Sequence, residues 1–150
     1  MPHFTLQVEN KGPMLNAMIS VSEARFNALS AADMPIPNGV PAQGLVDTGA
    51  SCTCIDHSIV DRSGLEPSGE ATLVTPSTID EAMTTEQYDI GIGLAIFAGT
   101  DEPPHLARNL PVIATPLVEH QGFHALIGRD VLSRYVLIYN GVLGAYTLAF

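Results

Sequence analysis

The sequence predicts a single all-β domain with one short helix near its carboxy-terminal end. Its 150 residues have the length of one domain, and a chain of this size buries enough surface to fold without disulfides. Apolar residues form 46% of the chain and occur in short runs, several of which alternate with polar residues as strands do. The 13 glycines and 11 prolines lie between these runs, as is typical of turns between short strands. We therefore expect residues 1–150 to form one domain.

The expected elements follow these runs in chain order. Residues 4–8 and 14–21 alternate on either side of a turn at 10–13, so we expect them to pair as a hairpin. Further strands are expected at 44–46, 71–75, 87–96, 110–115, 125–127, 136–139 and 146–150. The expected helix is at 130–134, with Asp130 in or near its capping position. Residues 24–31 and 60–64 are candidates for further helical turns.

The charge of the chain argues against two classes of partner. Its formal net charge of −10 repels nucleic-acid phosphates and anionic lipid, so we expect it to bind neither nucleic acid nor membrane. No apolar run approaches the ~20 residues of a membrane span, and no signal peptide is evident, so we expect a cytoplasmic protein. Cys52 and Cys54 are one residue apart, which places them on opposite faces of a strand. We expect buried structural thiols there, because no base that would activate them is identifiable.

The candidate chemistry lies in residues 45–50, which read Leu-Val-Asp-Thr-Gly-Ala. Asp47 directly follows apolar residues, and a buried carboxylate is costly unless it is hydrogen-bonded or shares a proton. Thr48 supplies a hydroxyl, and Gly49 lets the backbone turn sharply and approach a partner closely. Asp-Thr-Gly alone is also a common surface turn, so a second feature is needed before these residues indicate a function.

Residues 125–132, which read Ala-Leu-Ile-Gly-Arg-Asp-Val-Leu, supply that second feature. Together the two segments resemble the retropepsins, the aspartic proteases of retroviruses and their cellular and bacterial relatives. That family pairs an apolar-apolar-D-T-G-A segment with a later apolar-apolar-G-R-[ND]-x-L segment. Both occur here in the right order and at about the right distance, and the resemblance covers residues from about 14 to 150. It implies a retropepsin-like closed β-barrel, the acid protease fold, in a homodimer.

The resemblance implies an aspartic endopeptidase that hydrolyses internal peptide bonds. In this family two adjacent carboxylates share a proton and activate a water molecule, without a metal or another cofactor. The chain has one D-T-G motif, so the second carboxylate is expected to be Asp47 of another copy. The resemblance further implies that Thr48 reaches across the two-fold axis to the other chain. Gly49 is expected to hydrogen-bond the substrate or hold the carboxylate plane.

The resemblance also implies a peptide or protein substrate that lies beneath a flap. We expect the flap between residues 73 and 92, with its tip near 77–82. The substrate-binding candidates are Ala50, Ser51, Ile79, Leu126 and Ile127. Ala50 stands where pepsin-like enzymes usually have a hydroxyl residue that donates to the carboxylate. Because alanine cannot donate, we expect an activity optimum less acidic than that of pepsin.

Two features depart from the retroviral pattern. In retroviral enzymes the arginine of the second motif pairs with an acid, but the corresponding position here is Ser51. Arg129 is therefore expected to meet Asp56 or Asp61, or to cap backbone carbonyls. Residues 23–39 are an insertion that either covers a surface or takes part in the dimer contact.

Several alternatives stay open. The strand-like ends, 4–8 and 146–150, either join two subunits, as in the viral dimer, or pair within one. One rival function is a catalytically inactive retropepsin-fold module that binds peptides or dimerises. Another is a β-barrel of a different type, with Asp47 in a surface turn. No metal site is expected at His120 and His124, because Gly122 and the strand that follows argue against a helix that would align them.

Overall fold

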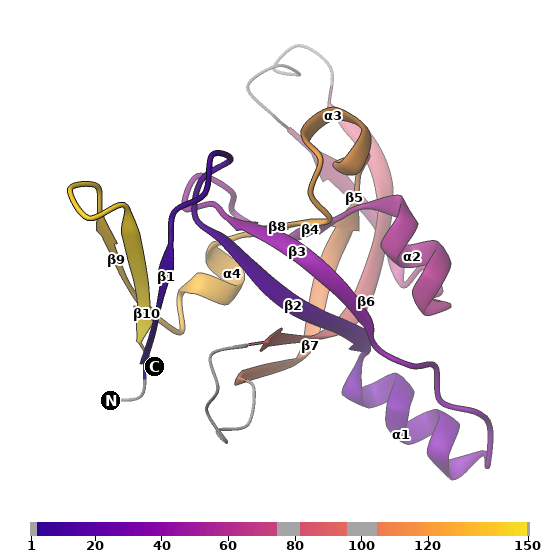
Figure 1. Ribbon diagram of the computed structural model, residues 1–150. Helices are drawn as coiled ribbons and strands as arrows, with labels where there is room; N and C mark the ends of the chain where they lie inside the picture. Colours follow the sequence, from indigo (N-terminus) through magenta and orange to yellow (C-terminus); the bar gives the residue numbers. More distant parts are fainter. Residues whose placement is uncertain (1–2, 75–81, 96–104, 150) are drawn as a thin grey trace.

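The fold is a β-barrel with a small separate sheet at one side and short helices around it (Figure 1). The computed structural model describes residues 3–74, 82–95 and 105–149. The strands are β1 His3–Gln7, β2 Met14–Val21, β3 Val40–Val46, β4 Cys54–Ile55, β5 Gly69–Leu73, β6 Met83–Ala95, β7 His105–Ala114, β8 Ala125–Ile127, β9 Val136–Asn140 and β10 Ala145–Ala149. The helices are α1 Glu23–Ala31, α2 His57–Ser63, α3 Val118–Gln121 and α4 Arg129–Leu132.

The barrel closes because β2 pairs with strands on both of its edges. The strand order is β2-β3-β8-β4-β7-β6-β5, and an additional pairing of β2 with β6 joins the two ends of the ring. β5 lies outside this ring and pairs with β6 alone in the described part of the chain. The predicted closed barrel is confirmed, although the described residues form three short helices in addition to α4.

Alternation along the barrel strands builds the main core. In β2 the side chains of Ala17 and Ile19 are buried, while those of Asn16 and Met18, on either side of Ala17, are exposed, as expected for a strand with one face inward. Ile92 of β6 stands opposite Ile19 across the β2–β6 pairing, and both are almost fully buried. The barrel therefore closes over a packed interior of branched apolar side chains.

A second sheet, in the order β1-β10-β9, lies beside the barrel, and it corrects one expectation. β1 pairs with β10 rather than with β2, so the predicted hairpin is wrong; its turn keeps only an isolated bridge between Glu9 and Gly12. This pairing sets Phe4 opposite Leu148, and both side chains are buried. The strand-like ends thus pair within one subunit.

The helices cover parts of the barrel surface. Ser22 caps the start of α1, because its hydroxyl accepts a hydrogen bond from the Arg25 amide. Glu23, the first residue of α1, forms a 2.7 Å ion pair with Arg108 of β7. α1 and the loop after it lie at the end of the barrel away from the β1-β10-β9 sheet (Figure 1). Among the described residues, none of the helices has the length and apolar character needed to span a membrane.

Candidate active site

The end of β3 places Asp47 beside the second motif. β3 and β8 run parallel with Val46 opposite Ile127, and the Asp47 amide donates to the Ile127 carbonyl at 3.0 Å. On the other side of β3, the Val46 amide donates to the Pro13 carbonyl at 2.9 Å. Asp47 is half-buried. The two motif segments, about 80 residues apart in sequence, therefore meet where the candidate carboxylate leaves the sheet.

The turn after Asp47 holds its carboxylate in one orientation. The Gly49 amide donates to Asp47 Oδ1 at 2.8 Å, and the Ala50 amide donates to the Asp47 carbonyl at 3.3 Å. A Cβ added to Gly49 would lie 3.1 Å from the same Oδ1, which is tighter than an ordinary contact. Glycine therefore suits this close approach of backbone and carboxylate, while Thr48 is exposed beside it.

A buried hydrogen-bond network joins the segment after the D-T-G turn to α4. Thr53 is fully buried; its amide donates to Asp130 Oδ2 at 2.8 Å and its hydroxyl donates to Oδ1 at 2.7 Å. The same hydroxyl accepts a hydrogen bond from the Gly128 amide at 3.1 Å. Hydrogen bonds to a charged acceptor are roughly twice as strong as neutral ones. Asp130 therefore fastens the segment that follows Asp47 to the first turn of α4.

Gly128 lies tightly against the backbone that follows the D-T-G turn. A Cβ at this position would lie 2.5 Å from the carbonyl carbon and 2.6 Å from the carbonyl oxygen of Cys52, both of them backbone atoms. Next to it, the Arg129 amide donates to the Ala50 carbonyl at 3.0 Å. The network of Gly128, Thr53 and Asp130, together with this backbone bond, is called the motif junction below.

The motif junction defines the place of Asp130 that was expected in or near the capping position. Gly128 is the N-cap of α4 and makes no side-chain cap bond, and Asp130 lies near it, in the first turn of the helix. Its carboxylate accepts from its own neighbour, the Val131 amide, and from Thr53 across the junction. Thr53 was not among the residues predicted from the sequence. The carboxylate of Asp130 in the second motif was a signal that a hydrogen-bond donor had to face it.

The candidate substrate-binding residues differ in how much of their surface is exposed to solvent. Ser51 is exposed, and Ala50 and Leu126 are half-buried, so all three have surface that a ligand could contact. Ile127 is fully buried and belongs to the main core, so its side chain offers no surface to a substrate in this subunit. Ile79 and the expected flap tip lie outside the described residues, but β5 and β6 pair antiparallel up to them, from Gly69–Gln87 to Leu73–Met83.

The carboxylate of Asp56 accepts hydrogen bonds from backbone amides and not from Arg129, so one of the partners expected for Arg129 is wrong. Its carboxylate accepts from the Ser58 amide at the start of α2, and from the amides of Leu117 and Val118. Burial works against ionisation, but these hydrogen bonds outweigh it and lower the pKa of Asp56 to about 2. Arg129 itself is exposed, and neither ion pair found among the described residues includes it.

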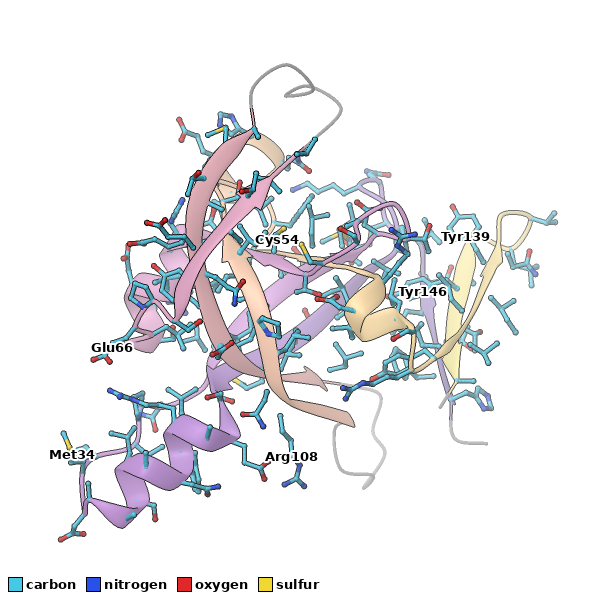
Figure 2. The ribbon with its side chains drawn as sticks, turned by 180° about the vertical axis from the view of Figure 1, so that it is seen from behind. Met34, Cys54, Glu66, Arg108, Tyr139 and Tyr146 are labelled. Atoms are coloured by element: carbon cyan, nitrogen blue, oxygen red, sulfur yellow. The ribbon has the colours of Figure 1, made fainter. Side chains whose placement is uncertain are left out.

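The two cysteines are free thiols. Cys54 is buried, and its Sγ donates a weak hydrogen bond to the Cys52 carbonyl at 3.9 Å. Burial, reinforced by the neighbouring Cys52, raises the pKa of the Cys54 thiol to about 12. A thiol is a poor nucleophile in this protonated form, so Cys54 is an inert part of the barrel. Figure 2 shows it within the fold, beside the strands.

His120 and His124, the two histidines considered for a metal site, lie in different local structures. α3 ends at Gly122, which adopts a left-handed backbone with φ of 72°, so His124 lies beyond the helix that contains His120. His124 Nδ1 accepts a hydrogen bond from the Gln43 amide at 3.2 Å. Over residues 3–74, 82–95 and 105–149, no group of three or more His, Cys, Asp or Glu is placed to hold a metal ion.

A comparison with models of known protein families assigns the chain to one of them. The family model described as "Aspartyl protease" matches residues 32–131 of the 150, a range that contains residues 45–50 and all of the second motif segment except Leu132. The chain belongs to the aspartyl protease family. Among curated proteins, no match is found. The resemblance drawn from the two motifs is thus confirmed by an independent comparison.

Two solved structures align with most of this chain. A retropepsin-like aspartic protease from Rickettsia conorii aligns with a TM-score of 0.58 and 13% sequence identity, covering 98% of this chain and 90% of that one. The retroviral protease-like domain of Ddi1 from Leishmania major aligns with a TM-score of 0.42 and 15% identity, covering 91% and 88% of the two chains. The first alignment shows a retropepsin-like fold for this aspartyl protease chain.

Proposed function

We propose that the chain is one subunit of a homodimeric aspartic endopeptidase in which Asp47 of each copy supplies half of the catalytic pair. The observation that carries this proposal is the lone D-T-G turn, with a half-buried carboxylate oriented by the Gly49 amide at 2.8 Å. Family membership supports a protease in general, and the single motif supports a site shared between two copies.

The proposed chemistry follows from placing two carboxylates side by side. Two negative charges in contact cannot both persist, so the pair holds one proton between them. The ionised Asp47 takes a proton from a bound water, whose oxygen attacks the scissile carbonyl carbon. The protonated Asp47 of the other copy donates to the carbonyl oxygen. Transfer of a proton to the leaving nitrogen then breaks the C–N bond and gives a carboxylic acid and an amine.

The other candidate residues take supporting roles in this proposal. Thr48, which is exposed beside Asp47, would reach the backbone of the second copy and fix the two turns against each other. Ala50, Ser51 and Leu126 would line the path of an extended peptide substrate. The paired strands β5 and β6 would carry the flap that closes over that peptide and excludes water.

The test compares the wild-type chain with Asp47→Asn on a denatured protein or a peptide library, with and without a statine-type inhibitor. We expect the substitution to lower the cleavage rate at least about 1,000-fold, because the amide cannot act as the base. Asp61→Asn is the matched control, since Asp61 is an exposed carboxylate on α2. A pH–rate profile of the wild type should peak at a less acidic pH than that of pepsin.

The outcomes separate the proposal from its rival. Cleavage by the wild type and by Asp61→Asn, lost in Asp47→Asn and blocked by the inhibitor, supports the peptidase. Equal background in all three proteins, with peptide binding retained, favours the catalytically inactive peptide-binding or dimerisation module. A chain that stays monomeric at high concentration would count severely against a shared site.

A further inference from the structure

Arg129 is an exposed cation that has no carboxylate partner among the described residues. It is the first residue of α4, and neither of the two ion pairs found in the described part of the chain includes it. The hydrogen bonds found there for Arg129 are backbone bonds, one from its amide to the Ala50 carbonyl and one to its carbonyl from the Ser133 amide. Its guanidinium is therefore available to a ligand that carries a negative charge.

The backbone of Arg129 is fixed beside the D-T-G turn. Its amide donates to the Ala50 carbonyl at 3.0 Å, and Ser51, the residue after Ala50, is exposed. The residues that follow Arg129 in α4 are turned toward the protein, because Asp130 accepts hydrogen bonds from Thr53 and the next two side chains are buried. Arg129 thus places a positive charge on the surface beside the turn that carries Asp47.

The other cations differ from Arg129 in their partners or in their place. Acceptors within the subunit are found for three of them, Lys11, Arg25 and Arg108. Arg62 is exposed on α2, and Arg134 is exposed after the end of α4. In the described structure, Arg129 is the cation whose backbone is bonded to the D-T-G turn. A charge preference at the candidate site is therefore expected to depend on this residue.

A carboxylate is the ligand group that suits the guanidinium. The planar guanidinium binds a carboxylate through two parallel N–H···O hydrogen bonds. An extended peptide that passes over Asp47 brings its side chains past Ser51 and Arg129, where an acidic side chain finds a partner. The net charge of −10 repels acidic peptides at long range. Salt screens that repulsion beyond about 8 Å, so the nearby guanidinium decides at contact.

We propose that Arg129 selects peptide substrates that carry Asp or Glu near the scissile bond. This inference rests on the proposed function, because it names the substrate class of that same site. Ser51, which carries no charge, leaves the guanidinium free for the substrate. In a homodimer each copy brings one Arg129, so the preference holds at two positions, one on either side of the scissile bond.

Matched peptides test this preference. Each pair is identical except for Glu or Gln at one position, and that position is moved through the residues on both sides of a mapped cleavage site. For the wild type at low salt, we expect the best Glu peptide to exceed its Gln counterpart about tenfold in kcat/KM. In Arg129→Gln this ratio should fall to about one. In Arg129→Glu it should fall below one, and a Lys peptide should become the better substrate.

The control is a second exposed arginine, and a neighbouring residue tests the same contact. Arg62→Gln should keep the Glu-to-Gln ratio of the wild type within about twofold, because Arg62 is on α2. Ser51→Asp sets a carboxylate beside Arg129 and should lower the ratio while the arginine is still present. Ser51→Asn, which adds a similar volume without charge, should lower it less. Circular dichroism and melting curves establish that each variant is folded.

Three results would overturn the inference. The first is a wild type that cleaves Glu and Gln peptides equally at every position. The second is a ratio that Arg129→Gln leaves unchanged, including the case in which both peptides are cleaved more slowly to the same extent. The third is Arg62→Gln that lowers the ratio as much as Arg129→Gln does. If Arg129→Gln does not fold, Ser51→Asp against Ser51→Asn decides, and equal ratios in those two variants would overturn it.

Binding measurements separate this inference from the proposed function. Fluorescence anisotropy compares the Glu and Gln forms of a statine-type inhibitor peptide on the wild type and on Arg129→Gln. If the wild type never cleaves but binds the Glu form more tightly through Arg129, the preference stands and the peptidase fails. If the wild type cleaves but neither binds nor cleaves the Glu form better, the peptidase stands and the preference fails. If it neither cleaves nor binds, both fail.

Discussion

The motif junction is buried and fully hydrogen-bonded, whereas the strand β9 and the turn after it carry exposed apolar side chains, called the β9 face here: Val136, Ile138, Tyr139, Val142 and Leu143. At the junction, Thr53 is fully buried and its amide and hydroxyl both bond to Asp130. Among the described residues, no buried side-chain nitrogen or oxygen is left without a hydrogen bond. On the β9 face, by contrast, Ile138 and Tyr139 each leave more than half of their side-chain surface in water.

The comparison shows which region is fully hydrogen-bonded and packed within one subunit, and which region stays exposed to water. The junction fixes the position of Asp47 through hydrogen bonds and close packing inside the subunit, so its geometry does not depend on a partner. The exposed side chains of the β9 face contribute little to the stability of the subunit, because they stay in water. We therefore expect substitutions at the junction to lower stability, and substitutions on the β9 face to change stability little.

The largest effect is expected where the junction is tightest. In Gly128→Ala the new Cβ would meet the backbone of Cys52 at 2.5 Å, so a main chain rather than a flexible side chain must move. We expect the free energy of unfolding to fall by about 4 kcal/mol or more, measured by urea denaturation. Gly69→Ala is the control, because a Cβ there has no atom within 4 Å. Equal stability of the two variants would contradict the close contact.

A smaller loss is expected when the junction loses one hydroxyl. Thr53→Val keeps the shape of the side chain but removes the donor to Asp130 Oδ1 and the acceptor of the Gly128 amide. We expect a cost of about 3 kcal/mol by the same measurement, because a carboxylate and a buried amide lose a partner. Thr53→Ser retains the hydroxyl and should recover most of that loss. If serine and valine cost the same, packing rather than hydrogen bonding holds the junction.

The fold was predictable from the sequence as far as local patterns reach. Residues 14–21, 125–127 and 136–139 alternate or stay apolar over short runs, and the structure has strands there. Alternation gives the face of a strand but not its partner, which is why β1 was expected to pair with β2. The two-residue strand β4 is too short to show any period, although it bridges β8 and β7 in the barrel.

The site was predictable where two motifs had to meet. Asp47 and the second motif are adjacent because β3 and β8 pair, as the resemblance implied. Thr53 gave no signal of its own, since a threonine between two cysteines looks like any strand residue until Asp130 lies against it. Burial of Ile127 depends on which face of β8 looks inward, and three residues are too few to decide this. The roles of Thr48 and Gly49 in catalysis stay proposals.

A carboxylate outside the motif junction, that of Asp56, is expected to make the stability of the barrel depend on acid. Hydrogen bonds from Ser58, Leu117 and Val118 lower the pKa of Asp56 to about 2, below the value of about 3.9 that an unfolded chain has. Because the folded pKa is the lower one, this stabilisation is present in full above about pH 4 and is lost as the pH falls toward 2. No Asp or Glu follows residue 130, so the β9 face has no such dependence.

The substitution Asp56→Asn measures how much the ionised carboxylate of Asp56 contributes to the free energy of unfolding. The amide keeps an oxygen that accepts hydrogen bonds but cannot ionise, so we expect the variant to be about 2 kcal/mol less stable than the wild type at pH 7. The difference should shrink as the pH falls from 4 to 2, where the wild-type carboxylate takes up its proton. Asp61→Asn, an exposed change on the same helix, should stay within about 0.5 kcal/mol throughout. A gap between Asp56→Asn and the wild type that persists unchanged at pH 2 would mean that the carboxylate acts through its shape rather than its charge.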